Sequence, residues 1–186
     1  MRIIGGNFKG KKIFLPKDKN TRPLRDLVKE SIFNLIEHSN KLNLKIDGSY
    51  ILDLFSGSGS FGLECISRGS LNVIFIENYQ KILSILKKNI KHLRVEDKSN
   101  IIEEDCFKFF NKDSLFKEKF QIIFIDPPFK EKNINSIIEK IKQKSLLTTD
   151  GIIILHRHKN DTVEITKKLD VLDTREYGIS KIIIGR

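Results

Sequence analysis

Cysteine is scarce in this chain, and long apolar runs are missing from it. The 186 residues include only two cysteines, Cys65 and Cys106, with no paired spacing. A disulfide scaffold and a four-cysteine zinc site are therefore excluded. No stretch approaches the roughly 20 apolar residues of a membrane-spanning helix, and the first residues do not resemble a signal peptide. We expect a cytoplasmic protein with no membrane association.

Acidic side chains are also in deficit. Lys and Arg number 34 against 24 Asp and Glu, so the formal net charge is +10. Such a charge favours a polyanionic partner, and nucleic acid is the first candidate. A lysine-rich coding bias is the plainer explanation, because the lysines are scattered along the chain. The apolar fraction of 39% and the chain length suit one globular domain with a small appendage.

Residues 1–20 are expected to form that appendage, with the main domain at residues 21–186. Two short apolar runs, near residues 2–4 and 11–15, flank Gly5-Gly6-Asn7 and predict a small N-terminal β-hairpin. The hairpin would carry an exposed Phe8 among lysines and could hold nucleic acid, although a plain surface hairpin fits equally well. Its candidate RNA-binding side chains are Lys9, Lys11 and Lys12.

Strands and helices alternate in the rest of the chain. Thr21 and Pro23 suit a helix start, and apolar residues at positions 24, 27, 28, 32, 35 and 36 continue the helix to about His38. Strands are expected at residues 50–55, 72–77, 100–104, 121–126 and 152–155, with helices between them, a turn at residues 149–151, and a closing antiparallel pair at residues 170–177 and 180–185. This alternation predicts an α/β fold with a doubly wound, mostly parallel seven-stranded sheet.

A glycine-rich turn follows the first of these strands. The segment from Asp53 to Gly62 contains G-x-G-x-x-G between a strand and a helix, where a ligand can approach bare backbone at the helix N-terminus. The glycines alone would suit a dinucleotide equally well. The Asp53 carboxylate, however, would repel a pyrophosphate and would attract the ammonium and sulfonium groups of S-adenosylmethionine.

Two further acids follow the next two strands. Glu77 lies 20 residues after Gly57, where an acid can bind both ribose hydroxyls, and Asp105 with Cys106 is placed to meet an adenine edge. Each acid taken alone could be a helix N-cap, but three at the ends of three successive strands favour a ligand. The predicted cofactor-binding set is Asp53, Phe55, Gly57, Gly59, Gly62, Glu77, Asp105 and Cys106.

Asp126-Pro127-Pro128-Phe129 follows the fourth strand. The prolines hold the backbone extended and donate no N–H, so carbonyl acceptors lie beside a carboxylate. The Asp126 carboxylate and the Pro127 carbonyl would orient an exocyclic base amine and stabilise the charge that develops on methylation. Phe129 would stack on a base extruded from its strand. We predict catalytic roles for Asp126, Pro127 and Phe129; a strand-ending Asp-Pro turn is the structural alternative.

These motifs, together with residues 2–13, Arg22-Pro23 and residues 62–69, resemble one bacterial family over nearly the whole chain. That family is the 16S rRNA (guanine(966)-N2)-methyltransferases, which are class I S-adenosylmethionine-dependent enzymes. The resemblance implies a monomer that methylates a guanine N2 amine in the small ribosomal subunit or an assembly intermediate, without a metal. Arg22 and Arg25 join the lysines as candidate RNA contacts.

The chain departs from the family pattern at a few positions. Leu24 and Leu27 replace the usual Thr and Arg, and His156-Arg157-His158 replaces a stretch where an acid is common. Residues 156 and 158 point the same way on a strand. Because no third ligand is in view, surface or RNA contacts are favoured over a metal site.

Other functions share part of this pattern. A DNA or other RNA amino-methyltransferase acting on adenine N6 would use the same Asp126 motif, because the motif reads an amine and not the whole base. A DNA enzyme would usually need a target-recognition domain, for which there is hardly room. An NAD-dependent dehydrogenase would share only the glycine turn. A non-catalytic RNA-binding module explains the charge but leaves the acids without a role.

Overall fold

The computed structural model describes residues 1–16, 24–112, 116–162, 165 and 168–186. Within them the strands form one seven-stranded sheet in the order β3-β2-β1-β4-β5-β7-β6. Neighbours among the first five strands are parallel, and β7 is antiparallel to both β5 and β6. The mostly parallel sheet with an antiparallel end confirms the predicted fold class. The strands are β1 (Tyr50–Leu54), β2 (Asn72–Ile76), β3 (Ser99–Ile102), β4 (Phe120–Ile125), β5 (Leu147–His158), β6 (Val171–Tyr177) and β7 (Ser180–Gly185).

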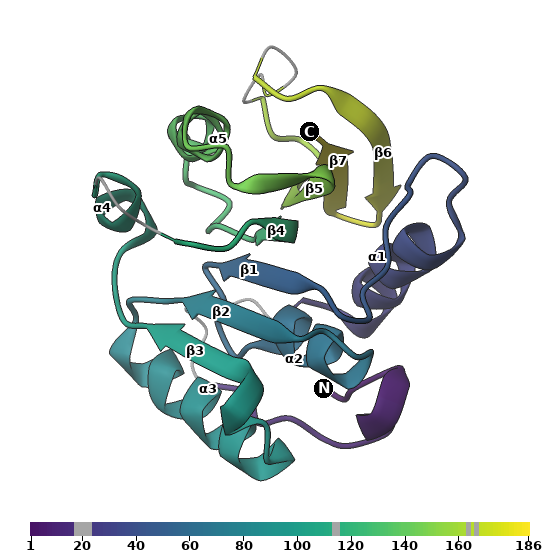
Figure 1. Ribbon diagram of the computed structural model, residues 1–186, viewed down its shortest axis with the longest axis vertical. Helices are drawn as coiled ribbons and strands as arrows, with labels where there is room; N and C mark the ends of the chain where they lie inside the picture. The colour runs from purple at the N-terminus through teal and green to yellow at the C-terminus, as the bar shows by residue number, and fades with distance from the viewer. Residues whose placement is uncertain (17–23, 113–115, 163–164, 166–167) are drawn as a thin grey trace.

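Helices cover both faces of the sheet (Figure 1). Side chains alternate across each strand, so Ile51 of β1 packs into the core beneath α1, α2 and α3, while Leu52 packs into the core beneath α4 and α5. Nearly every position of the central strands is buried for this reason. None of the described helices is both long enough and apolar enough to cross a membrane. The helices are α1 (Asp26–His38), α2 (Ser60–Ser67), α3 (Gln80–Leu93), α4 (Cys106–Phe110) and α5 (Ile134–Gln143), with short 3-10 turns at Gly6–Phe8 and Glu96–Lys98.

Two local predictions are corrected by the structure. Residues 149–151 do not form a turn, because β5 continues through them as one strand. The β4–β5 register jumps there from Phe120 opposite Leu147 to Ile122 opposite Ile152, so the extra residues form a bulge inside the strand. Leu27 is 67% exposed and lies off the buried face of α1. The predicted helix start at Thr21 and Pro23 lies outside the described residues.

The N-terminal segment pairs with itself less than predicted. Its antiparallel pairing is one bridge between Arg2 and Lys12, flanked by a hydrogen bond from Ile3 N to Lys11 O of 2.9 Å, and regular strands do not form. Gly5-Gly6 serve a different purpose from a hairpin turn. A Cβ at Gly6 would lie 1.9 Å from the Ser67 carbonyl, so the glycines let the backbone lie directly on α2.

A buried ionic cluster holds this segment in place. The Glu64 carboxylate on α2 accepts hydrogen bonds from Ile4 N (2.8 Å) and Gly5 N (2.7 Å). The Lys29 ammonium on α1 lies 3.3 Å from Glu64 and donates to the Arg2 carbonyl at 2.7 Å. Both charged side chains are fully buried, and burial lowers the pKa of Lys29. Since buried charges are tolerated only when paired, the cluster fixes the segment against both helices.

Candidate active site

A cleft of about 650 Å³ opens at the carboxyl ends of the parallel strands. It lies where β1 has β2 on one side and β4 on the other, which is the topological switch point of this sheet. Predicted residues from both motifs line it together. These are Asp53, Phe55, Gly57, Glu77, Asp126, Pro127 and Phe129. We call the side formed by the ends of β1 and β2, which we predict to hold the cofactor, the cofactor wall. The side formed by residues 126–131, which we predict to hold the methyl acceptor, is called the acceptor wall.

The Asp53 side chain is buried and lines the cleft. It accepts a hydrogen bond from Gly62 N at 3.0 Å, so the helix start holds the carboxylate. Burial raises the pKa of Asp53 well above its usual value, the Gly62 N–H opposes that shift, and Asp126 and Glu77 add to it. An ionised carboxylate in this position is therefore costly until a cation lies beside it.

Close packing against neighbouring side chains requires glycine at two positions of the glycine-rich turn. Gly59 has a φ of 80°, and a Cβ there would lie 2.5 Å from Leu86 of α3. A Cβ at Gly62 would lie 2.3 Å from the ring of Phe75. Gly57 lines the cleft, whereas Gly59 and Gly62 stand behind its surface. A contact of Gly59 or Gly62 with a cofactor remains a prediction.

Glu77 braces the turn from the second strand. One carboxylate oxygen accepts from Gly57 N at 2.8 Å, and the other accepts from Asn78 N and Tyr79 N at 2.9 and 3.0 Å. Because a carboxylate has about four acceptor sites, these three bonds leave about one for a hydroxyl donor. Glu77 thus joins the glycine turn to the next loop and faces the cleft.

Asp105 and Cys106 lie away from the cleft lining. The Asp105 carboxylate caps α4 by accepting from Lys108 N at 3.0 Å, and it also accepts from the Asn78 amide at 3.2 Å. Cys106 is 2% exposed, and burial raises the pKa of its thiol. Asp105 therefore has the helix N-cap role that was the structural alternative for it. An adenine contact for Asp105 and Cys106 stays a prediction.

On the acceptor wall, His156 of β5 holds Asp126. The ring Nδ1 lies 2.9 Å from Asp126 Oδ1, and Nε2 lies 2.9 Å from Ser180 Oγ. His156 is 2% exposed, so the expected surface or RNA contact is wrong for this residue. The reason is topological: β5 is an internal strand between β4 and β7, and His156 pairs with Ile182 of β7.

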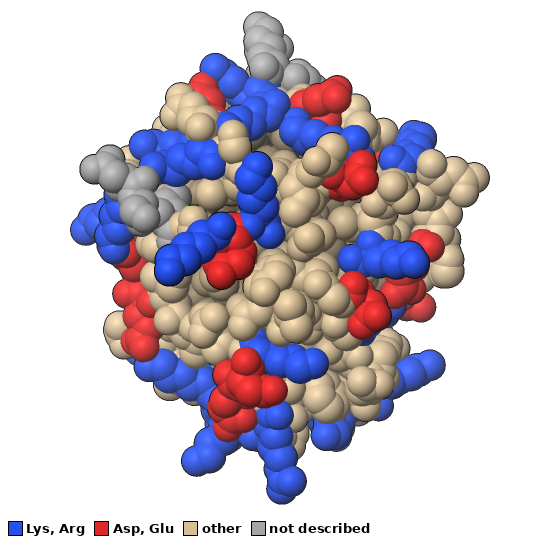
Figure 2. All heavy atoms as spheres, in the orientation of Figure 1, with Lys and Arg blue, Asp and Glu red and all other residues tan. Residues whose placement is uncertain are grey.

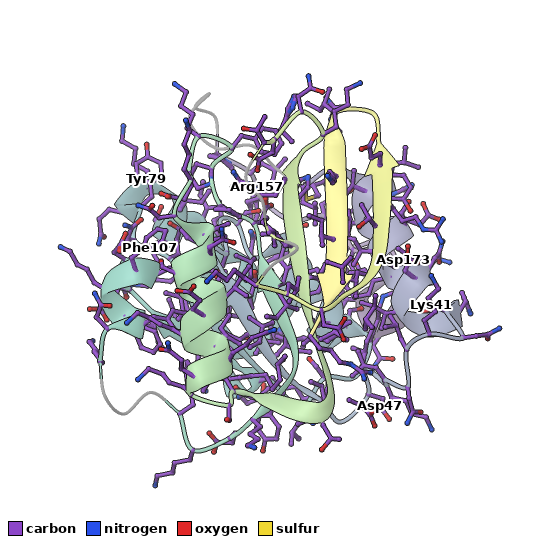
Figure 3. The ribbon with its side chains drawn as sticks, turned by 90° about the horizontal axis from the view of Figure 1, so that it is seen from above. Lys41, Asp47, Tyr79, Phe107, Arg157 and Asp173 are labelled. Atoms are coloured by element: carbon purple, nitrogen blue, oxygen red, sulfur yellow. The ribbon has the colours of Figure 1, made fainter. Side chains whose placement is uncertain are left out.

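Arg157 holds the rest of the same loop. Its guanidinium donates to the carbonyls of Glu131 (2.6 Å), Phe129 (3.3 Å) and Pro128 (3.5 Å) and pairs with the Asp161 carboxylate. The side chain is 1% exposed, and Figure 3 labels it at the end of β5. Such a planar fork suits several acceptors at fixed positions. Arg157 therefore fixes the backbone immediately after the predicted amine acceptors.

Phe129 is supported by the two histidines that flank Arg157. Its ring meets His158 edge-on at 5.0 Å between centroids and meets His156 at 5.8 Å. All three side chains of residues 156–158 thus contact the acceptor wall. Sequence reasoning missed this role; the one available signal was three consecutive basic side chains at a strand end.

Within the described residues no group of His, Cys, Asp or Glu could hold a metal ion.

The candidate RNA contacts are mostly exposed. Lys9, Lys12 and Arg25 are exposed, and the exposed Lys11 has its ammonium 4.8 Å from the Phe8 ring. Phe8 itself is half-buried and not exposed as expected. Arg22 lies outside the described residues. Figure 2 shows basic side chains spread among acidic ones on one face of the molecule, in agreement with their scatter along the sequence.

Several residues that line the cleft were not anticipated as site residues, and Lys130 and Leu24 are two of them. Lys130 is exposed and lines the cleft directly after Phe129, where its ammonium can meet a phosphate. Leu24 is 4% exposed and lines the cleft from the segment just before α1. Lys130 belongs to no recognisable motif, and Leu24 was noted only as a departure from the family pattern, so the fold is what reveals that both face the cleft.

Comparison with known proteins agrees with this architecture. The Buchnera aphidicola (subsp. Baizongia pistaciae) protein named ribosomal RNA small subunit methyltransferase D is 30% identical over 182 residues, covering 98% of this chain and 88% of the relative. The structure of a hypothetical protein from Thermus thermophilus superposes with a TM-score of 0.80 at 20% identity, covering 100% of this chain and 99% of the other. An RNA methyltransferase from Salinibacter ruber, solved with S-adenosyl-L-homocysteine, gives a TM-score of 0.60 at 14% identity, covering 88% and 92%.

The fold is that of the Rossmann-like class I methyltransferases, with its cleft at the expected switch point. The chain matches the family described as Conserved hypothetical protein 95 over residues 1–186. It therefore belongs to that family, and the match extends over every residue of the printed sequence.

Proposed function

We propose that this protein transfers a methyl group from S-adenosylmethionine to the exocyclic N2 amine of a guanine in the RNA of the small ribosomal subunit. One observation carries the proposal: the carboxylates of Asp53 and Asp126 stand at the ends of the paired strands β1 and β4 and face one cleft. The first suits a cationic cofactor, and the second suits an amine.

The cofactor wall fits S-adenosylmethionine on chemical grounds. A buried carboxyl whose pKa is raised by burial gains most from a neighbouring cation, and this cofactor carries an ammonium and a sulfonium. Glu77 stands at the end of the adjacent strand, where it can accept a ribose hydroxyl. When bound, the cofactor supplies an electrophilic methyl group. The aromatic side chains of Phe55 and Phe61 line the same cleft.

The acceptor wall would hold the amine for in-line attack. The Asp126 carboxylate and the Pro127 carbonyl accept its two N–H bonds and stabilise the positive charge that grows on nitrogen. In the transfer a carbon–nitrogen bond would form as the carbon–sulfur bond of the cofactor broke, and the nitrogen would then lose a proton toward the Asp126 carboxylate. Phe129, held by two histidines, stacks on the base, an interaction worth about 1–3 kcal/mol per base.

The RNA partner follows from charge and from the named relative. Methyltransferase D of Buchnera aphidicola is named for the small-subunit ribosomal RNA, and this chain carries a net charge of +10. Phosphate contacts would come from the N-terminal lysines, Arg25 and Lys130, and they would weaken steeply as salt rises. We place the enzyme in the cytoplasm, as a monomer that uses no metal.

The test is transfer of a labelled methyl group from S-adenosylmethionine to small ribosomal subunits and, in parallel, to free 16S rRNA. Labelling of either RNA by the protein, and none by Asp126→Ala, is expected. A comparison of S-adenosylmethionine with NADH in a binding assay removes the dehydrogenase alternative. Binding of NADH without S-adenosylmethionine, or label that persists in the Asp126 variant, would refute the proposal.

A further inference from the structure

The acceptor wall contains a buried hydrogen-bonded chain that the proposed function does not use. It runs from Asp126 Oδ1 to His156 Nδ1 and from His156 Nε2 to Ser180 Oγ, with 2.9 Å at each step. His156 and Ser180 are 2% and 3% exposed. Buried polar side chains are kept only when their partners are well placed, so each link has a fixed geometry.

This constellation has the order of a hydrolytic triad, but its setting excludes that chemistry. Ser180 is the first residue of β7 and does not line the cleft, so no substrate can reach its hydroxyl. Asp126 does line the cleft. The end of the chain that meets a substrate is therefore the carboxylate, and the serine is the buried anchor.

The partners determine the protonation pattern of the chain. An ionised carboxylate only accepts hydrogen bonds, so Nδ1 of His156 must be the donor to Asp126. In a neutral imidazole Nε2 is then the acceptor, and the Ser180 hydroxyl donates to it. The serine thereby fixes both the tautomer and the ring plane of His156, and His156 in turn fixes one oxygen of Asp126.

We propose that His156, anchored by Ser180, is a positioning residue for the methyl acceptor: it orients the Asp126 carboxylate toward the target amine. This inference rests on the proposed function and deepens it. A carboxylate on a short side chain rotates about two bonds, and a hydrogen bond from a buried ring removes that freedom. Its orientation is then set before the base arrives, as attack along the methyl–sulfur axis requires.

The cofactor wall is held by different groups, which makes the inference testable. Asp53 is bound by Gly62 N and Glu77 by Gly57 N, and neither contact involves β5. Loss of the His156 ring should therefore slow the transfer step while S-adenosylmethionine still binds. A general structural role would reduce both together.

The experiment compares steady-state methyl transfer and cofactor affinity for the full chain and four variants. His156→Ala removes both hydrogen bonds, His156→Asn keeps an amide donor near the position of Nδ1, and Ser180→Ala removes only the anchor. His38→Ala is the matched control, because His38 is exposed at the last turn of α1. Small ribosomal subunits are the substrate, and cofactor affinity is measured by calorimetry without RNA.

We expect His156→Ala to lower kcat by roughly 100-fold, with the Kd for S-adenosylmethionine unchanged. His156→Asn should recover most of the lost rate, Ser180→Ala should lose less than His156→Ala, and His38→Ala should match the parent. Should His156→Ala fail to fold, Ser180→Ala decides: reduced kcat at unchanged Kd supports the inference.

Equal kcat in the parent and in His156→Ala or Ser180→Ala would overturn the inference while leaving the proposed function intact. Parallel loss of kcat and cofactor affinity, with no recovery in His156→Asn, would overturn it as well. A parent protein that labels no RNA would instead refute the proposed function. The two failures are thus distinguishable.

Discussion

The two walls of the cleft are built by different means. On the cofactor wall, Asp53 is held by Gly62 N nine positions away, and Glu77 by Gly57 N 20 positions away. On the acceptor wall, Asp126 is held by a side chain 30 positions away, His156 on β5. Backbone N–H groups of one local motif organise the first wall, whereas side chains of a distant strand organise the second. The second wall can therefore change without altering the first.

The walls differ in electrostatics as well. Asp53 is 1% exposed, and its pKa is raised because burial outweighs the single backbone hydrogen bond. The acceptor wall instead places the buried guanidinium of Arg157 and the His156 ring around its carboxylate and carbonyls. The cofactor wall is thus prepared for an incoming cation, and the acceptor wall is complete before any ligand arrives.

The largest expected effect separates transfer from cofactor binding. Asp126→Ala removes the proposed amine acceptor, and we expect methyl transfer to fall by about 100- to 1,000-fold. The Kd for S-adenosylmethionine should stay within a few-fold of the parent value, because Asp53 and Glu77 are unaffected. Rapid-quench transfer and calorimetry measure the two quantities. Asp126→Asn, which keeps one acceptor oxygen, is the matched variant and should retain more activity.

Removal of Arg157 should break the acceptor wall itself. Arg157→Ala removes a buried guanidinium that pairs with Asp161 and donates to three backbone carbonyls, so the free energy of unfolding should fall by about 3–5 kcal/mol. Arg175→Ala is the control, since Arg175 is half exposed and pairs with Asp173 at the surface; it should cost under about 1 kcal/mol. Urea denaturation measures both. Similar losses of unfolding free energy for the two variants would show that the contacts of Arg157 with residues 128–131 and Asp161 contribute little.

Substitution of Asp53 should weaken the cofactor wall and stabilise the fold. Asp53→Asn keeps an acceptor for Gly62 N but removes the negative charge. We expect the affinity for S-adenosylmethionine to fall by about 10- to 100-fold, as loss of one charged hydrogen bond predicts. An unchanged Kd in calorimetry would show that Asp53 does not meet the cation.

The same variant has a pH dependence whose sign follows from the raised pKa of Asp53. The parent protein loses stability as pH rises from the ordinary carboxyl range through the raised folded-state pKa, because the unfolded chain ionises more readily. Asp53→Asn lacks that loss. Its stability advantage without ligand should therefore be absent in acid and should grow with pH across this window. Urea unfolding at a series of pH values would show it, and an advantage confined to acid would contradict it.

The smallest expected effect concerns a tie between the cofactor wall and the N-terminal segment. Asn89 on α3 is fully buried, accepts from Phe14 N at 2.7 Å, and donates to the carbonyls of Phe14 and Ser58. Asn89→Ala should cost about 1–3 kcal/mol, because it leaves buried backbone groups without partners. Asn100→Ala, at an exposed pair with Asn72, should cost under about 0.5 kcal/mol. Equal thermal midpoints for the two variants would show that the Asn89 hydrogen bonds do not stabilise the fold.

Local patterns were enough to predict the sheet and to bring Asp53, Gly57 and Glu77 to one cleft, while their contact with a cofactor stays a prediction. The apolar runs at β1, β2 and β4 fill strands buried on both faces, and the Asp53–Gly62 turn positions its own carboxylate through neighbouring N–H groups. The extra residues near Gly151 were misinterpreted as a turn, because a bulge and a turn use the same residue types. These are short-range features, which explains both the successes and that failure.

Long-range contacts could not be predicted in the same way. Gly5 and Gly6 looked like a hairpin turn, but their small size matters because α2 lies against them. His156 looked like a surface residue until the antiparallel pairing of β5 with β7 placed Ser180 beside it. Neither α2 nor β7 is near these residues in the chain, so no local pattern contains the information.

The most direct measurement identifies the nucleoside that carries the transferred methyl group. Small ribosomal subunits would be labelled with S-adenosylmethionine, their RNA digested to nucleosides, and the labelled product separated by chromatography. The account predicts N2-methylguanosine in reactions with the parent protein and its loss with Asp126→Ala. Label in N6-methyladenosine, in a ring-carbon or ribose methyl group, or in no nucleoside would contradict it.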